Sequence, residues 1–228
     1  MDCMLPDDFI LENEPAKTWR EAELVVKFHL RPIKGKKTPL LQAWLDAPLP
    51  AFTPTEQEQF DKHLLRAIEN ISGWNEAELK MKFIAHILEL GLLEEGNGIT
   101  TCFDRSISSV VEGVPLSVRS DFMIASGYQN VIQQPYFHFQ EYKPSLNPTG
   151  EPMAQILEAF LIAQNMNKKT IPLYGVEVVG EHWKFVVMEG RDYCISPPYT
   201  CTVREDLTHI IAILRQFKEI LETTLIKL

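Results

Sequence analysis

The chain has 228 residues, of which 45% are hydrophobic and 23% are charged, and its formal net charge is −9. This composition is that of a globular protein, and the length suits one domain, or one domain with an extension, that buries a sizeable core. No segment approaches the roughly 20 apolar residues of a membrane span, and the acidic N-terminus lacks the basic-then-apolar order of a signal peptide. A cytoplasmic protein is therefore expected, and its negative charge argues against a non-specific coat on nucleic acid.

The N-terminal region, residues 1–72, is predicted to be a helical extension. Short helices are expected at Trp19–Phe28 and Pro39–Asp46, and a third helix is expected after Thr53, which is a typical N-cap with proline at the next position. The loop Gly35–Thr38 is similar to the end of a phosphate-binding loop, but no strand precedes it. It is interpreted as a basic loop, with phosphate contact as the alternative.

Residues 73–228 are predicted to form the main domain, in which helices alternate with strand-like runs. A long helix is expected first, at Asn75–Leu90, because apolar residues recur there at helical spacing and Gly91 is a stop signal. Period-two alternation and bounding turn residues then predict strands at Ile99–Val111, Pro115–Ala125 and Pro135–Lys143, a helix from Pro152 to about Met166, a hairpin of Leu173–Val179 and His182–Met188, and a C-terminal helix. This order indicates an α/β layer sandwich with a mixed five-stranded sheet flanked by helices.

Charged residues at the ends of two of these strands form the candidate site. Because side chains alternate with period two, one strand is expected to carry two aromatic and two charged residues on a single face: Phe137, Phe139, Glu141 and Lys143. An apolar face that turns into a carboxylate and an ammonium group is costly unless the charges have partners. A divalent cation held together with Asp121 of the preceding strand would supply such a partner.

The order of the motifs resembles that of the PD-(D/E)XK nuclease superfamily, which is restriction endonuclease-like: Glu76 on the long helix, then Asp121, then the Glu-Tyr-Lys strand end at 141–143, then Gln155 on the next helix. The resemblance covers about residues 74–190. It is closest to the N-terminal nuclease domains of type I restriction subunits, and to an uncharacterised bacterial group that shares the helical extension. Ser120 stands where the family has a proline before the aspartate.

The resemblance implies a Mg²⁺- or Mn²⁺-dependent nuclease that hydrolyses phosphodiester bonds in nucleic acid, with DNA favoured as the substrate. Asp121 and Glu141 would hold the metal, with the backbone carbonyl of Tyr142 as a third oxygen ligand. Lys143 would orient the attacking water and stabilise the developing negative charge. The remaining two residues would assist: Glu76 in an outer shell or on a second cation, and Gln155 by orienting Lys143 or a phosphate.

Each of these residues also has a plainer structural interpretation. Asp121 and Glu141 could be solvent-facing strand residues, and Lys143 could be a charge at a strand edge. Glu76 could form a helix-surface ion pair with Lys80, and Gln155 could be a helix-surface amide. The alternative function is accordingly a catalytically silent or partner-dependent protein of the same fold that serves as a nucleic-acid-binding or protein-binding module. A homodimer or a partner subunit is compatible with either function.

Overall fold

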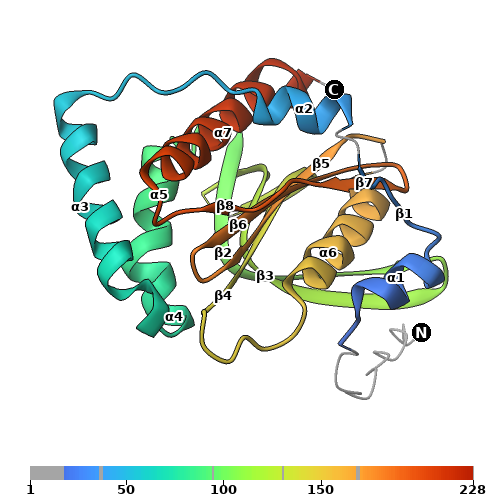
Figure 1. Cartoon of the computed structure of the whole chain (residues 1–228). Coiled ribbons are helices and arrows are strands. Elements are labelled where there is room, and N and C mark those ends of the chain that lie inside the picture. Colours follow the sequence, from blue (N-terminus) through green and yellow to red (C-terminus); the bar gives the residue numbers. More distant parts are fainter. Residues whose placement is uncertain (1–17, 36–37, 94, 130, 168–169, 228) are drawn as a thin grey trace, which may run out of the picture.

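A computed structural model describes residues 18–35, 38–93, 95–129, 131–167 and 170–227. The acidic N-terminus and two lysines of the predicted basic loop, Lys36 and Lys37, lie outside the described residues. The described chain is an α/β protein in which helices cover both faces of one mixed sheet (Figure 1). Of the helices that can be described, none is both long and apolar enough to cross a membrane.

The helices begin and end close to their predicted positions. The α-helices of the described chain are α1 (Glu21–Lys27), α2 (Pro39–Leu45), α3 (Pro54–Asn70), α4 (Glu76–Leu79), α5 (Ala85–Leu90), α6 (Pro152–Asn167) and α7 (Arg204–Thr223), joined by the 3₁₀ turns η1 (Ile71–Gly73) and η3 (Leu225–Lys227) and the π turn η2 (Lys80–Ile84). Thr53 caps α3 as expected, because its hydroxyl accepts the Glu56 N–H at 3.3 Å while the Glu56 carboxylate accepts the Thr53 N–H at 2.7 Å.

The strands of the described chain are β1 (Arg31–Pro32), β2 (Ile99–Val111), β3 (Val114–Tyr128), β4 (Val131–Lys143), β5 (Leu173–Val179), β6 (His182–Glu189), β7 (Asp192–Ile195) and β8 (Tyr199–Thr200). They form one sheet in the order β1-β7-β6-β5-β4-β3-β2, with β8 paired to β6. The β1–β7 and β4–β5 pairs are parallel, which makes the sheet mixed. The prediction of five strands is wrong, since the described chain has eight; the three additional strands, of two to four residues, are too short to show a period-two pattern.

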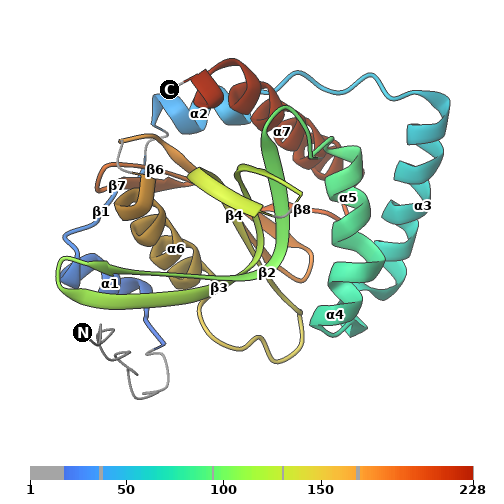
Figure 2. The same ribbon diagram turned by 180° about the vertical axis from the view of Figure 1, so that it is seen from behind.

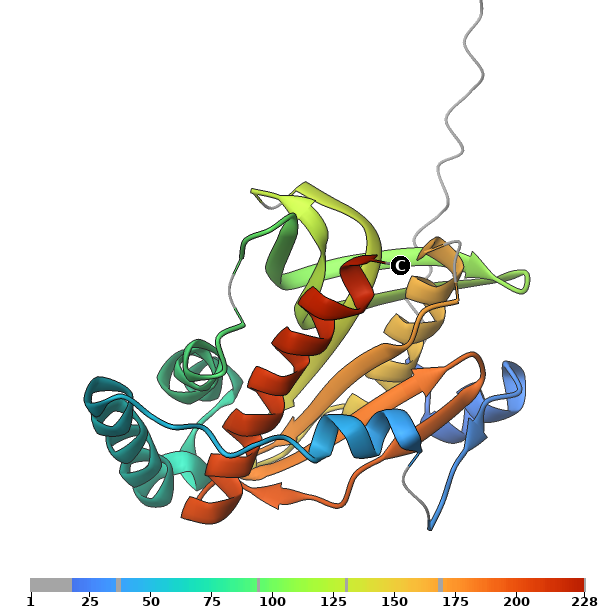
Figure 3. The ribbon, with the colours of Figure 1, turned by 90° about the horizontal axis from the view of Figure 1, so that it is seen from above.

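Each face of the sheet has its own hydrophobic core (Figure 3). On one face lie α2 and α7, where Trp44 and Phe217 pack against each other and Trp44 contacts Phe185 of β6. On the other face lie α1 and α6, whose Phe28 and Phe160 belong to a second cluster. The long β2–β3 hairpin extends along the α6 side towards α1 (Figure 2). Helices that precede residue 73 thus contribute to both cores. A domain boundary at residue 73 stays a prediction.

A bulge in β4 reverses the direction of one predicted side chain. The register between β3 and β4 skips one residue of β4, Phe137. Phe137 packs in the α2–α7 core, whereas Phe139 packs in the α1–α6 core. The prediction that Phe137 shares a face with Phe139, Glu141 and Lys143 is therefore wrong, because an extra residue resets the alternation. Glu141 and Lys143 follow Phe139 at period two and keep the predicted face.

The long predicted helix is a continuous run of turns, α4–η2–α5. Asn75 caps it, since its side chain accepts the Glu78 N–H at 2.9 Å and the Glu78 carboxylate accepts the Asn75 N–H at 3.1 Å. Within this run η2 is a π turn, and one extra residue there changes how Glu76 and Lys80 are directed relative to the buried residues of α5. Such turns are frequent at functional sites.

Candidate functional site

Four of the five predicted site residues come together where β3, β4 and α4 meet. Asp121 precedes Phe122, whose partner in β4 is Gln140, so Asp121 and Glu141 occupy facing positions on adjacent strands. Their exposed fractions are only 7% and 3%, so the interpretation of both as solvent-facing strand residues is wrong. Glu76 approaches them from the first turn of α4.

Ion pairs connect these residues into one cluster. The Lys143 ammonium donates to Glu141 Oε1 at 2.6 Å and lies 3.7 Å from Glu76 Oε2. The Lys80 ammonium donates to Glu76 Oε1 at 2.7 Å and to Asp121 Oδ1 at 2.5 Å. Three carboxylates therefore share two ammonium groups, which leaves one negative charge in excess. These five residues are called the carboxylate–lysine cluster below.

Lys80 is the member of the cluster that sequence reasoning did not assign to the site. The predicted ion pair between Glu76 and Lys80 along the helix is present. Lys80, however, also reaches across to β3, where it contacts the buried Asp121. The spacing of four residues between Glu76 and Lys80 was the signal in the sequence that could have placed Lys80 in the site. A helix-surface pair has the same spacing, and only the packing of α4 on the sheet distinguishes a site residue from a surface residue.

Burial and charge shift the protonation of the cluster in opposite directions. The pKa of Glu141 is raised to about 7, chiefly by burial and also by the neighbouring Asp121 carboxylate, while Lys143 opposes both effects. Burial also disfavours the charged form of Lys143, but the attraction of Glu141 outweighs it and the pKa of Lys143 lies above its usual value. Near neutral pH the excess charge of the cluster is thus balanced in part by a proton on Glu141, a role that a bound cation would take over.

Tyr142 supports the cluster from the backbone of β4. Its amide N–H donates to Asp121 Oδ2 at 2.7 Å, while its ring lies in the core on the opposite face of the sheet. There the Tyr142 hydroxyl donates to Gln140 Oε1 at 2.6 Å, and Gln140 Nε2 lies 2.8 Å from His138 Nε2. All three side chains are fully buried, and burial lowers the pKa of His138 to about 3, so the imidazole is neutral. The back of β4 is therefore fixed by a polar chain directly behind Glu141 and Lys143.

Ser120 takes the place of the proline that the resembled family has before the aspartate. Its buried hydroxyl lies 2.9 Å from the Phe122 carbonyl and 3.3 Å from the Gln140 carbonyl of the neighbouring strand. The substitution therefore adds a side-chain contact between β3 and β4 next to Asp121 and leaves the position of the aspartate beside Glu141 intact.

Gln155 of α6 lies apart from the ion pairs but shares a pocket with Lys143. This pocket, of about 380 Å³, is called the Lys143 pocket; its walls include Trp19, Arg119, Lys143, Gln155 and Glu158. A second pocket of about 410 Å³ adjoins it, since both contain Trp19 and Gly150, and reaches Arg20. Sequence reasoning did not find the roles of Trp19, Arg119 and Glu158 in these walls. Glu158 alone carried a signal, because it is a charged residue in the otherwise apolar run of α6.

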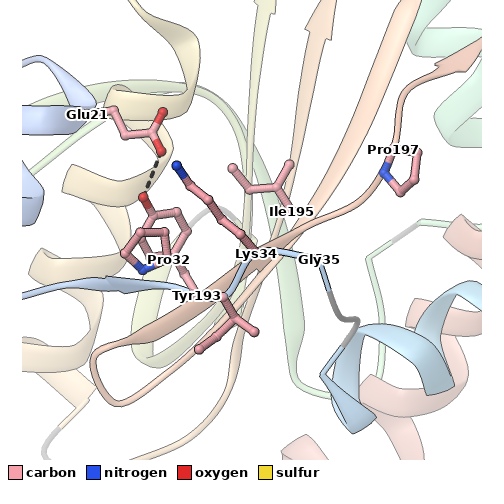
Figure 4. Close-up of a pocket in the computed structure, with 8 residues that line it drawn as sticks. Glu21, Pro32, Lys34, Gly35, Tyr193, Ile195 and Pro197 are labelled. Atoms are coloured by element: carbon pink, nitrogen blue, oxygen red, sulfur yellow. Dashed lines mark hydrogen bonds between the residues drawn. The ribbon is translucent and has the colours of Figure 1, made fainter.

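A larger pocket, of about 500 Å³, is lined by residues of α1, β1 and β7 (Figure 4). Its walls are mostly apolar, and the Tyr193 hydroxyl donates to Glu21 Oε1 at 2.7 Å inside it. The Lys34 side chain extends towards that pair. None of the predicted site residues lines this pocket, so size and chemistry point to different places, and the cluster of buried charges is the more informative of the two.

Comparison with known proteins gives weak likenesses to solved structures. Neither a protein-family model nor a curated protein matches the sequence. Among solved structures, the chain is similar to the protein in a cryo-electron microscopy structure of a DrdV–DNA complex, with 12% sequence identity and a TM-score of 0.40. The aligned region covers 72% of this chain and 14% of that chain, so the chain spans a small part of that protein's length. A likeness of this degree leaves the function to be argued from the residues of the site.

Proposed function

We propose that this protein is a Mg²⁺- or Mn²⁺-dependent nuclease that hydrolyses phosphodiester bonds in nucleic acid, with DNA as the favoured substrate. The observation that carries the proposal is the burial of Asp121 and Glu141 at facing strand positions, with the Lys143 ammonium 2.6 Å from Glu141. Buried carboxylates that face each other are costly unless a cation or proton compensates them. A hydrolytic site that binds phosphate through a divalent cation gives this arrangement a use.

The donor set fits a hard divalent cation. Among the described residues, no group of three or more histidine, cysteine or acidic side chains is arranged to hold a metal ion. Mg²⁺ does not need such a group, because it is commonly held by one or two carboxylates, with water and substrate phosphate completing its shell. Asp121 and Glu141 would provide those carboxylates. When bound, the cation would supply Lewis-acid activation of the phosphodiester and of a water nucleophile.

The carbonyl of Tyr142 is proposed as a further oxygen ligand. The N–H and C=O groups of one strand residue point to the same side of the strand. Because the Tyr142 N–H donates to Asp121, its carbonyl is directed to that side as well. The same residue would thereby orient the aspartate and offer an oxygen beside it.

The remaining residues act through charge and position. The Lys143 ammonium would orient the attacking water and stabilise the negative charge that develops on the phosphate. Glu76 would hold Lys80 and Lys143 in place, since it contacts both ammonium groups. Gln155, on the wall of the pocket that Lys143 lines, would donate its amide to a phosphate oxygen.

A binding module without catalytic activity is the second candidate. One observation favours it: the Lys80 ammonium already neutralises Asp121, so the cluster approaches charge balance without any metal. In such a protein the fold would hold nucleic acid or another protein, alone or with a partner subunit, and the charges would serve structure. The two candidates differ in whether wild-type protein cleaves and whether a divalent cation binds at Asp121.

Cleavage of labelled single- and double-stranded DNA and RNA, with Mg²⁺ or Mn²⁺, tests the proposal. Wild-type protein should cleave at least one substrate, and Lys143→Met should lower the rate by about 10²-fold or more, because it removes a charge that acts on the transition state. Lys82→Met is the matched control. Lys82 lies in η2 and pairs with Glu78 of α4, and neither residue belongs to the carboxylate–lysine cluster.

Two outcomes of this assay oppose the proposal in different ways. If Lys143→Met cleaves at the wild-type rate, the activity has another site. If wild-type protein cleaves none of the substrates with either metal, the binding module becomes the better account.

A further inference from the structure

The Lys143 pocket has walls that suit a nucleobase. Lys143 places one end of this pocket at the carboxylate–lysine cluster, and the other walls combine an aromatic ring, Trp19, with polar side chains of α6. We propose that the pocket receives an unpaired base of the strand that is cut, so that the substrate is single-stranded or locally unpaired nucleic acid. This inference rests on the proposed nuclease function for the identity of the neighbouring site, but it makes a separate claim about binding.

Trp19 provides the surface on which a base can stack. The indole is half-buried and forms an edge-on contact with Phe28 of α1, with ring centroids 5.8 Å apart, so the ring is anchored to the fold. It lines both the Lys143 pocket and the adjoining pocket that reaches Arg20. Aromatic side chains in such grooves stack on bases of any sequence, each contact contributing about 1–3 kcal/mol.

Glu158 provides groups that can meet the edge of a base. Glu158 is 5% exposed, and its Oε1 accepts the Ser117 N–H at 3.1 Å, which fixes the carboxyl group in the wall. Burial raises the pKa of Glu158 to about 7, so the protonated form, with one donor and one acceptor, is available near neutral pH. Base edges present the same combination of a donor and an acceptor.

The position of the pocket requires the base to be unpaired. Inside a duplex, a base is stacked and paired, so it can stack on Trp19 in this pocket only when it is extruded or already single-stranded. The positive groups of this pocket and the adjoining one, Lys143, Arg119 and Arg20, contact at most a few phosphates. The net charge of −9 weakens the overall attraction of the chain for the phosphates of a long duplex. Local stacking on Trp19 would replace part of that missing electrostatic affinity.

Binding measured without cleavage tests this inference. In EDTA, fluorescence anisotropy would compare wild-type protein on labelled single-stranded DNA, single-stranded RNA and a DNA hairpin duplex of equal length. Single strands should bind more tightly than the duplex, and Trp19→Ala should weaken single-strand binding by about 10-fold. Trp19→Phe should retain most of the affinity because it keeps an aromatic ring. Tyr128→Ala, which removes an exposed aromatic residue at the β3–β4 turn, is the matched control and should bind like wild type.

An oligonucleotide built entirely of abasic nucleotides separates stacking from a general loss of folding. If a base stacks on Trp19, the Trp19→Ala variant should lose no further affinity for this abasic strand, since the contact is already absent. An equal loss on normal and abasic strands would overturn the inference, as would equal affinity of wild type for duplex and single strands.

Failure of this inference can be told apart from failure of the nuclease proposal. Trp19-dependent binding of single strands by a protein that cleaves nothing would support the inference and contradict the nuclease. Metal-dependent cleavage of duplex DNA, unchanged in Trp19→Ala, would support the nuclease and overturn the inference.

Discussion

Each oxygen of the Asp121 carboxylate has a donor of its own: the Lys80 ammonium contacts Oδ1 and the Tyr142 amide contacts Oδ2. A carboxylate oxygen has more than one lone pair, so these contacts leave acceptor capacity for a cation. Lys80 nevertheless repels any cation that approaches the oxygen it holds. In the proposed metal site, affinity for the cation would therefore depend on a balance between the attraction of the carboxylates and the repulsion of Lys80.

Removing the charge of Lys80 should strengthen metal binding. We expect Lys80→Met to bind Mn²⁺ about 10-fold more tightly than wild type, because it removes a positive charge from beside Asp121, the proposed metal ligand, while keeping a side chain of similar length. Isothermal titration calorimetry measures this affinity, with Lys82→Met as the control. Weaker binding by Lys80→Met would show that Lys80 positions Asp121 rather than competing with the metal.

The protonation of Glu141 should appear in the pH dependence of stability. Folding raises the pKa of Glu141 from its usual value of 4.5 to about 7, chiefly through burial. Between pH 4.5 and 7 the folded protein therefore holds a proton on Glu141 that the unfolded chain has released. This group therefore makes the protein progressively less stable as the pH rises from about 4.5 to 7. In EDTA, the Tm of wild type relative to Glu141→Gln should fall across that range, on the order of 2–4 °C for each kcal/mol, and level off above it. Parallel Tm profiles for the two proteins would contradict the shift.

At the scale of elements, β4 carries two different kinds of polar side chain on its two faces. Glu141 and Lys143 are on the α6 side, and the buried chain of His138, Gln140 and Tyr142 is on the α7 side. The second set has no access to solvent, so its hydrogen bonds serve to fix the strand that carries the first set. The rigidity of the site thus depends on residues of the opposite core.

Loss of one hydrogen bond in that buried chain should destabilise the protein. Tyr142→Phe removes the donor to Gln140 Oε1 and leaves this oxygen without its partner in the core, so we expect a decrease of about 1–3 kcal/mol in the free energy of unfolding. Urea denaturation measures it. Tyr128→Phe, at a tyrosine that is 71% exposed, should stay within about 0.5 kcal/mol of wild type. A Tyr142→Phe value equal to that of the control would show that the hydroxyl contributes little to the core.

Single-residue irregularities mark where elements could not be predicted from the sequence. The alternation of β4 correctly placed Glu141 and Lys143 with Phe139, but the bulge sends Phe137 to the other core. The π turn η2, which begins at Lys80, is a similar irregularity, because it adds one residue within a run whose sequence pattern is that of an ordinary helix. Both depend on packing between segments that are distant in the chain, which local periodicity does not record.

At the scale of the whole molecule, long regular elements were predictable and non-local contacts were not. The five long strands and the helices carry enough periodicity to be found, whereas β1 and β7 are short and form a parallel pair only because the segment after α1 returns to the sheet. The contact of α1 with α6 brings Trp19 into the same pocket as Gln155, so the walls of the Lys143 pocket come from segments more than 100 residues apart. Motif order predicted the cluster; tertiary structure alone reveals what surrounds it.

The nuclease proposal requires Asp121 and Glu141 to form a binding site for a divalent cation. A calorimetric titration of the purified protein with Mn²⁺, comparing wild type with Asp121→Asn, measures this binding. Asp61→Asn is the control, since Asp61 pairs with Arg204 on the surface at 2.7 Å. The account predicts saturable binding by wild type and by the control, and at least about 10-fold weaker binding by Asp121→Asn. Equal affinity in wild type and Asp121→Asn, or no binding by wild type, would contradict it.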